Sequence, residues 1–107
     1  MLALKAGVTV GGLSPEILLA IMVAHAVFQE FGQGLTLTSV RDGMHKTGSK
    51  HYQGDGVDLR TRVFDSEATK RAVRDVLASR LGHDYDVVLE PTHIHVEYDP
   101  KTEQLHA

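Results

Sequence analysis

The chain of 107 residues has the length of one ordinary domain, and we expect a single domain whose compact part covers about residues 10–100. Its formal net charge of −3 lacks the positive field that nucleic-acid binding requires, so nucleic acid is not an expected partner. The absence of cysteine excludes disulfides and thiolate metal sites, which leaves His, Asp and Glu as the metal ligands to consider.

The N-terminal sequence has neither the pattern of a signal peptide nor that of a membrane span. Residues 1–7 lack a cationic start followed by a long apolar run. The apolar stretch 18–24 ends at His25, far short of the roughly 20 residues that cross a bilayer. We therefore expect a soluble protein that is cytoplasmic at synthesis and does not insert into membranes.

A first helix is predicted from Pro15 to about Phe31. Ser14 can cap its start, Pro15 suits the first turn, and Gly32 is expected to end it. His25 lies on the expected buried face, where a histidine is more often a packed residue than a metal ligand. Helical spacing predicts that this face contains Leu18, Ile21, Met22, His25, Phe28 and Gln29.

Two strands are predicted in the middle of the chain. Residues 35–40 alternate apolar and hydroxyl side chains, as a half-buried strand does, and deliver Arg41 to the start of a glycine-rich loop. Loops of this kind often border sites. Residues 56–60 are predicted to form a second short strand, which places Asp58 on a rigid element, and the small Gly56 is expected to allow a close approach of the backbone at a metal.

A second helix is predicted to begin at residues 65–67 and to stop at Gly82, followed by two short strands around Pro91. Its charged residues, which include Lys70 and Arg71, are more typical of a solvated face than of a binding patch. The order of elements predicts an α+β domain in which helices pack on a small antiparallel sheet. The expected buried stripe of the helix consists of Ala68, Ala72, Val73, Val76, Leu77 and Leu81.

The last strand carries two histidines and a glutamate on one face. In an extended chain His93, His95 and Glu97 point to one side, and Ile94 and Val96 point to the other. Such a polar face is costly to bury unless something binds it. Together with His51 and Asp58, which are seven residues apart and framed by glycines, these residues indicate a metal site. Histidine nitrogen and carboxylate oxygen suit zinc, whose catalytic sites use three protein ligands and one water.

Residues 49–58 (SKHYQGDGVD) resemble the S-x-H-x-x-G-x-(A/G)-x-D motif of the zinc D-alanyl-D-alanine carboxypeptidases and related murein peptidases. That family includes phage endolysins and shares its fold with the hedgehog signalling domain. Residues 93–95 resemble its H-x-H motif, and the resemblance covers residues 35–98. It implies a hedgehog-like, D-Ala-D-Ala peptidase-like fold and one Zn²⁺ per chain, bound by His51, Asp58 and His95.

The same resemblance implies further roles. Glu90 is the implied general base, His93 lies beside the metal, and Arg41 binds substrate or the transition state together with Ser49 of the first motif. Two alternatives remain open. Glu90 stands three residues before His93, a spacing that precedes the zinc histidine in several family members, so His93 competes with His95 as third ligand. Glu97 shares the strand face with His95 and competes with Glu90 as the base.

The function implied by the resemblance is zinc-dependent hydrolysis of peptide bonds in peptidoglycan stem peptides, by a carboxypeptidase or an endopeptidase. The missing signal fits a phage-encoded enzyme that acts on the cell wall after lysis, or as part of a virion with other virion proteins as partners. The alternative is a non-catalytic, zinc-stabilised structural or peptidoglycan-binding module, for instance a phage tail component. A carboxylate near the site favours the enzyme.

Overall fold

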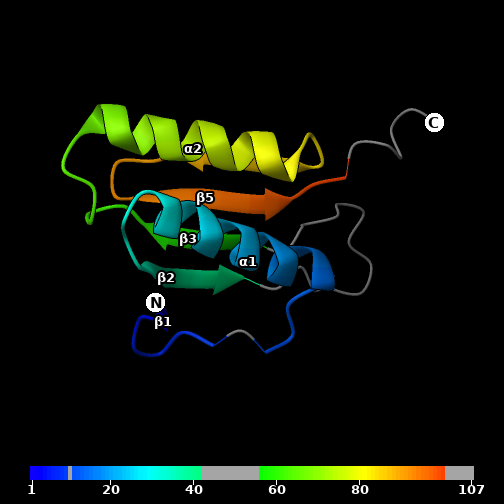
Figure 1. Cartoon of the computed structure of the whole chain (residues 1–107). Helices are drawn as coiled ribbons and strands as arrows, with labels where there is room; N and C mark the ends of the chain where they lie inside the picture. The colour runs from blue at the N-terminus through cyan, green and yellow to red at the C-terminus, as the bar shows by residue number, and fades with distance from the viewer. Residues whose placement is uncertain (10, 42–55, 101–107) are drawn as a thin grey trace.

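The computed structural model describes residues 1–9, 11–41 and 56–100, with only the main chain of Arg41 (Figure 1). A sheet carries both described helices on one of its faces (Figure 1). No helix in these ranges is long and apolar enough to cross a membrane. In chain order the elements are β1 (Leu2–Leu4), α1 (Pro15–Glu30), β2 (Leu35–Arg41), β3 (Gly56–Arg60), α2 (Glu67–Leu81), β4 (Tyr85–Leu89) and β5 (His93–Tyr98).

The sheet has the strand order β1-β2-β3-β5-β4. The pairs β2–β3, β3–β5 and β5–β4 are antiparallel, whereas β1 pairs with β2 in parallel, with Leu2 opposite Leu35. The predicted α+β class is confirmed, but the prediction of a purely antiparallel sheet is wrong. The error comes from β1, whose three residues are too few to display the alternation that identifies a strand.

Helix α1 has the predicted bounds but a different buried face. Ser14 Oγ accepts a hydrogen bond from the amide of Ile17 at 3.3 Å, and Gly32 follows the helix with a positive φ of 79°. The side chains that face the core are Ile17, Ala20, Ile21, Ala24, Val27 and Phe28.

The predicted burial of Leu18 and Met22 is wrong, since these side chains are 43% and 69% exposed, and Gln29 is exposed as well. Residues 17–24 are all apolar, so their spacing alone does not fix which side of the helix meets the sheet. The structure turns two alanines toward the sheet, and their small side chains permit close packing.

Helix α2 is capped by Ser66, whose Oγ accepts from the amide of Thr69 at 3.1 Å. Val73 and Leu77 are buried as predicted, but Ala68 and Ala72 are exposed, because the helix buries a narrow stripe beside β4 and α1. Arg80 near its end makes two hydrogen bonds to the carboxylate of Glu30, one of them from Nη2 at 2.6 Å. This contact joins the C-terminal ends of the two helices.

The core lies between the sheet and the helices. Alternate residues of the strands point into it and are fully buried, namely Leu35, Leu37, Val57, Leu59, Ile94 and Val96. Because side chains alternate along a strand, the intervening residues of β3 and β5 lie on the side turned away from the helices. We call this side the polar face, defined by Gly56, Asp58 and Arg60 of β3 and by His93, His95 and Glu97 of β5.

Candidate functional site

Strand register assembles the candidate site on the polar face. The antiparallel pairing of β2, β3 and β5 places Ser39 opposite Asp58, and Asp58 opposite His95. Two residues further along β3, Arg60 lies opposite His93 of β5. Residues directly opposite in an antiparallel pair have Cβ atoms about 4.5–5.5 Å apart, so their side chains are neighbours. The two stretches that the sequence singled out therefore meet at Asp58 and His95.

The imidazole of His95 lies between two carboxylates. Its Nδ1 is 2.7 Å from Asp58 Oδ1, and its Nε2 is 3.3 Å from Glu97 Oε1. The three side chains are 23–29% exposed, with Asp58 at 23%, Glu97 at 25% and His95 at 29%. The ring is thus oriented from both nitrogens, in a partly shielded place that remains accessible.

Gly56 makes room for the His95 ring. A Cβ at this position would lie 3.1 Å from Cε1 of His95 and 3.4 Å from the carbonyl oxygen of Val96. Contacts between carbon atoms ordinarily begin at about 3.5 Å, so any side chain here would press on the ring. The predicted close backbone approach at a metal stays a prediction, and what the structure shows at Gly56 is the packing of the His95 ring.

His93 lies beside the same aspartate. Its Nε2 is 3.6 Å from Asp58 Oδ1, a distance too long for a hydrogen bond. Its Nδ1 is 3.1 Å from the hydroxyl of Thr92. His95 is therefore the histidine in direct contact with Asp58, and His93 is its neighbour.

The pair formed by Asp58 and His95 suits two ligands of one zinc ion. Donor atoms on a tetrahedral zinc, each about 2.0–2.2 Å from the metal, lie about 3.4 Å apart. The observed 2.7 Å therefore has to open by only about 0.7 Å, with Nδ1 of His95 as the ligating atom. The contact of Nε2 with Glu97 fits as well, since metal-bound histidines usually donate their other N–H to a carboxylate, carbonyl or water.

A third ligand is needed, and the predicted one is His51. His51 and the predicted substrate-binding Ser49 lie outside the described residues. Within residues 1–9, 11–41 and 56–100, no group of three His, Asp or Glu side chains is arranged to hold a metal ion. Of the three predicted ligands, Asp58 and His95 lie in the described part of the chain.

Main-chain hydrogen bonds and strand pairing give the positions of Glu90 and Arg41. The amide of Glu90 donates to the carbonyl of His93 at 2.8 Å, which closes the β4–β5 hairpin, and the Glu90 residue is exposed. Extended by one residue, the β4–β5 register puts Glu90 opposite His93, on the polar face. Arg41, the last residue of β2, pairs with Gly56 of β3, and the ring of His95 packs on Gly56.

No protein-family model, curated protein or solved structure matches this chain. The resemblance in the sequence therefore rests on its motif residues. Of these, Asp58, His93 and His95 lie in the described part of the chain, and they come together there.

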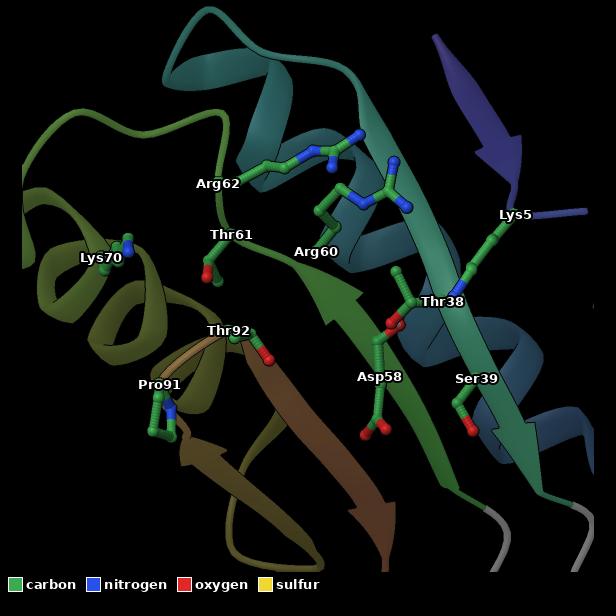
Figure 2. Close-up of a pocket in the computed structure, with 10 residues that line it drawn as sticks. All are labelled: Lys5, Thr38, Ser39, Asp58, Arg60, Thr61, Arg62, Lys70, Pro91 and Thr92. Carbon is green, nitrogen blue, oxygen red and sulfur yellow. Dashed lines mark hydrogen bonds between the residues drawn. The ribbon is translucent and has the colours of Figure 1, made fainter.

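A pocket of about 460 Å³ adjoins Asp58, and Figure 2 shows the side chains around it. Sequence reasoning named Asp58 but missed the other residues of this pocket. One signal was present, since Arg60 stands two residues after Asp58 in a predicted strand and so shares its face. The pocket is lined by Lys5, Thr38, Ser39, Asp58, Arg60, Thr61, Arg62, Lys70, Pro91 and Thr92.

Proposed function

We propose that this chain is a zinc-dependent metallopeptidase that hydrolyses peptide bonds in peptidoglycan stem peptides. The observation that carries the proposal is the contact between Asp58 and His95, which are 37 residues apart and belong to two separate motifs. Glu97 behind the far nitrogen of His95 supports it, because a carboxylate in that place holds a metal-binding imidazole in the required orientation.

The proposed zinc ligands are His51, Asp58 through Oδ1 and His95 through Nδ1. A bound zinc ion supplies two effects, a lower pKa for its water and polarisation of the scissile carbonyl. The fold family that the motifs imply, the hedgehog and D-Ala-D-Ala peptidase type, is part of the proposal. It is supported by the pairing of Asp58, the last residue of the first motif, with His95 of the second motif on neighbouring strands.

The remaining roles fall to residues around the pair. Glu90 accepts the proton of the attacking water and passes it to the leaving amine, as a general base and then a general acid. His93 donates from Nε2 to the developing oxyanion, in the tautomer whose Nδ1 accepts a hydrogen bond from the Thr92 hydroxyl. Arg41 and Ser49 hold the substrate. The proposed setting is the bacterial cell wall, reached after phage lysis or from a virion.

Glu97 is less suited than Glu90 to the role of base. Its Oε1 faces the His95 nitrogen that points away from Asp58, so its carboxylate is engaged in orienting the ring. Glu90 is exposed and lies across the hairpin from His93. Glu90→Gln preserves shape but cannot accept a proton, so it is expected to lower turnover by about 10²–10⁴-fold with zinc retained.

The deciding experiment is digestion of purified peptidoglycan with the zinc-loaded protein, followed by mass analysis of the released peptides. The wild type should release peptides whose masses identify the bond cleaved, Glu90→Gln should release almost none, and elemental analysis should find one zinc in both. If the zinc-loaded wild type releases no peptide, the hydrolase proposal is wrong, and zinc with wall binding would then indicate a non-catalytic module. Loss of turnover in Glu97→Gln but not in Glu90→Gln would make Glu97 the base.

A further inference from the structure

Exposed apolar side chains are concentrated at one edge of the molecule. Among the described residues, the large apolar side chains that are exposed lie in residues 1–4 or in the first half of α1, with the single exception of Val88. Scattered apolar residues are normal on a protein surface, whereas a group of them at one place marks an interaction site. The group consists of Met1, Leu2, Leu4, Leu18, Leu19 and Met22, with exposed fractions of 43–83%.

Helix α1 is apolar on its solvent side as well as on its core side. Residues 17–28 contain His25 but no Asp, Glu, Lys or Arg. A surface helix normally carries charged residues on its outer side, and a helix that is apolar all round is normally covered on all sides. The sheet covers one side of α1 and leaves Leu18 and Met22 exposed, so this part of the helix is suited to a further contact.

The exposed side of α1 borders an apolar depression of about 520 Å³, to which it contributes Leu18 and Met22. Strand β1 contributes Leu2 and Leu4, which point to the helix side of the sheet because their partners in β2 do. The described lining of this depression contains no charged residue. The side chain of Lys5, just after β1, extends across β2 toward Thr38 (Figure 2) and lines the pocket beside Asp58 instead.

The strand beside the depression also has an open outer edge. β1 lies at one end of the sheet (Figure 1). The amide of Lys5 donates to the carbonyl of Leu37 in β2 at 2.9 Å. Main-chain groups alternate sides along a strand, so those of Leu2 and Leu4 point away from β2. Within residues 1–9, 11–41 and 56–100 these amides and carbonyls have no hydrogen-bond partner. Edge strands are normally protected by Lys, Pro or a covering element, and Leu2–Leu4 contains neither residue.

We propose that β1 pairs with β1 of a second copy of this chain, antiparallel, across a two-fold axis at Ala3. In this register Leu2 of each copy lies opposite Leu4 of the other, and each of the two Leu2–Leu4 pairs exchanges both main-chain hydrogen bonds. One patch then serves both copies, as a two-fold interface requires. This inference does not depend on the proposed peptidase function.

A second copy fits this surface better than a charged partner does. The depression offers no charge that a different protein would recognise, whereas it presents apolar surface to the same apolar surface of the copy. The two-fold axis keeps both α1 helices on one side of the joined sheet, with Leu2 and Leu4 of both copies between them. The exposed apolar side chains offer on the order of 600 Å² per copy, the low end for specific interfaces, so a weak dimer is expected.

The first test measures the oligomeric state by sedimentation velocity from about 1 µM to 1 mM protein, a range that covers weak dimers. The wild type should change from monomer to dimer within it, with or without zinc. Leu4→Glu should raise the dissociation constant by about 100-fold or more, because it places an unpaired carboxylate of each copy in the interface. Val88→Glu is the matched control and should dimerise normally, since Val88 lies on the opposite edge strand β4 and is 45% exposed against 44% for Leu4.

A variant on the helix tests the same interface independently of the strand. Met22→Lys replaces a side chain that is 69% exposed, so it should fold normally and should also weaken the dimer. Circular dichroism of dilute protein verifies that each variant is folded. The proposal is overturned if folded Leu4→Glu and Met22→Lys dimerise as the wild type does. It is also overturned if the wild type remains monomeric up to the highest concentration, in which case the edge of β1 is left to a strand of another protein.

A disulfide tests the position of the two-fold axis. The chain has no cysteine, so Ala3→Cys introduces a single thiol that faces its own counterpart in the second copy. Opposed residues that exchange no hydrogen bonds have Cα atoms about 4.5 Å apart, a distance that a disulfide spans. Under mild oxidation Ala3→Cys should form a covalent dimer about tenfold or more faster than Val88→Cys, because the dimer holds its thiols together. Equal rates for these two variants would overturn the pairing at Ala3.

Discussion

Substitution of Gly56 tests whether His95 holds its position over this glycine to bind a metal. A Cβ there would lie 3.1 Å from Cε1 and 3.5 Å from Nε2 of His95. Carbon contacts begin at about 3.5 Å, so alanine requires the ring to retreat by about 0.4 Å, and the branched side chain of valine requires more. Metal sites hold their ligand distances within about 0.2 Å, so both displacements disturb a zinc bound through Nδ1.

The expected loss of zinc affinity can be estimated from the free energy that overpacking costs. Forcing extra methyl groups into a filled space costs about 1–3 kcal/mol, which corresponds to roughly 5- to 150-fold in a dissociation constant. We expect Gly56→Ala near the lower end and Gly56→Val near the upper end, measured by zinc competition with a chromophoric chelator. Gly11→Val is the control, because no atom lies within 4 Å of a Cβ at that position and its φ is not positive.

Folding of the Gly56 variants is checked by circular dichroism and thermal unfolding of the zinc-free protein. Zinc affinity in a folded Gly56→Val equal to that of the wild type would refute the argument, because His95 could then not be both packed on Gly56 and bound to zinc.

Three further predictions concern residues around this contact. His95→Ala should lose zinc by elemental analysis, whereas His93→Ala should keep it and lose turnover; the opposite metal contents would identify His93 as the ligand. Glu97→Gln should weaken zinc binding about 10- to 100-fold by the same competition assay, as loss of an orienting carboxylate does, and unchanged affinity would remove it from that role. Tyr85→Phe should destabilise the fold by about 1 kcal/mol in urea unfolding at neutral pH, since the Tyr85 hydroxyl donates to the carbonyl of Glu16 at 2.8 Å. Burial raises the pKa of Tyr85 above its ordinary value near 10, so this stabilisation is complete below pH 10 and is lost as pH rises through the raised pKa. The difference in unfolding free energy between the wild type and Tyr85→Phe should therefore narrow at alkaline pH. A constant difference would contradict the stabilising role of the Tyr85 hydroxyl.

The sequence predicted the polar face of β5 because alternation alone determines that His93, His95 and Glu97 share a side. It could not predict which histidine meets Asp58. That choice depends on the register of β3 against β5, and a slip of two residues would keep every side chain on its face while placing His93 or Glu97 opposite Asp58. The register places His95 opposite Asp58, and the choice of His95 as zinc ligand, which the family resemblance favoured, stays a prediction.

The orientation of α1 and the presence of β1 could not be predicted from the sequence either, because both depend on tertiary packing. The continuous apolar run of residues 17–24 offers several faces of similar hydrophobicity, and tertiary packing selects among them. In the orientation that α1 adopts, Leu18 and Met22 lie beside β1. Together with Leu2 and Leu4 they line an apolar depression. The helix orientation and the short parallel strand thus belong to one packing solution, which no single segment specifies.

The position of β3 inside the sheet has a consequence for how the protein loses function under mild stress. Asp58 and His95 are held by a ladder that runs from Gly56–Glu97 to Arg60–His93, with β2 and β4 on the outer sides of the two strands. Glu90 lies in the hairpin at the end of the edge strand β4, where local opening requires little more than fraying. A low concentration of denaturant should therefore abolish turnover while zinc stays bound. Amide hydrogen exchange should be faster at Glu90 than at the β3 amides by several orders of magnitude. In the proposed enzyme, the base Glu90 would lie on the part of the sheet that opens first, and the proposed ligands Asp58 and His95 on the part that opens last.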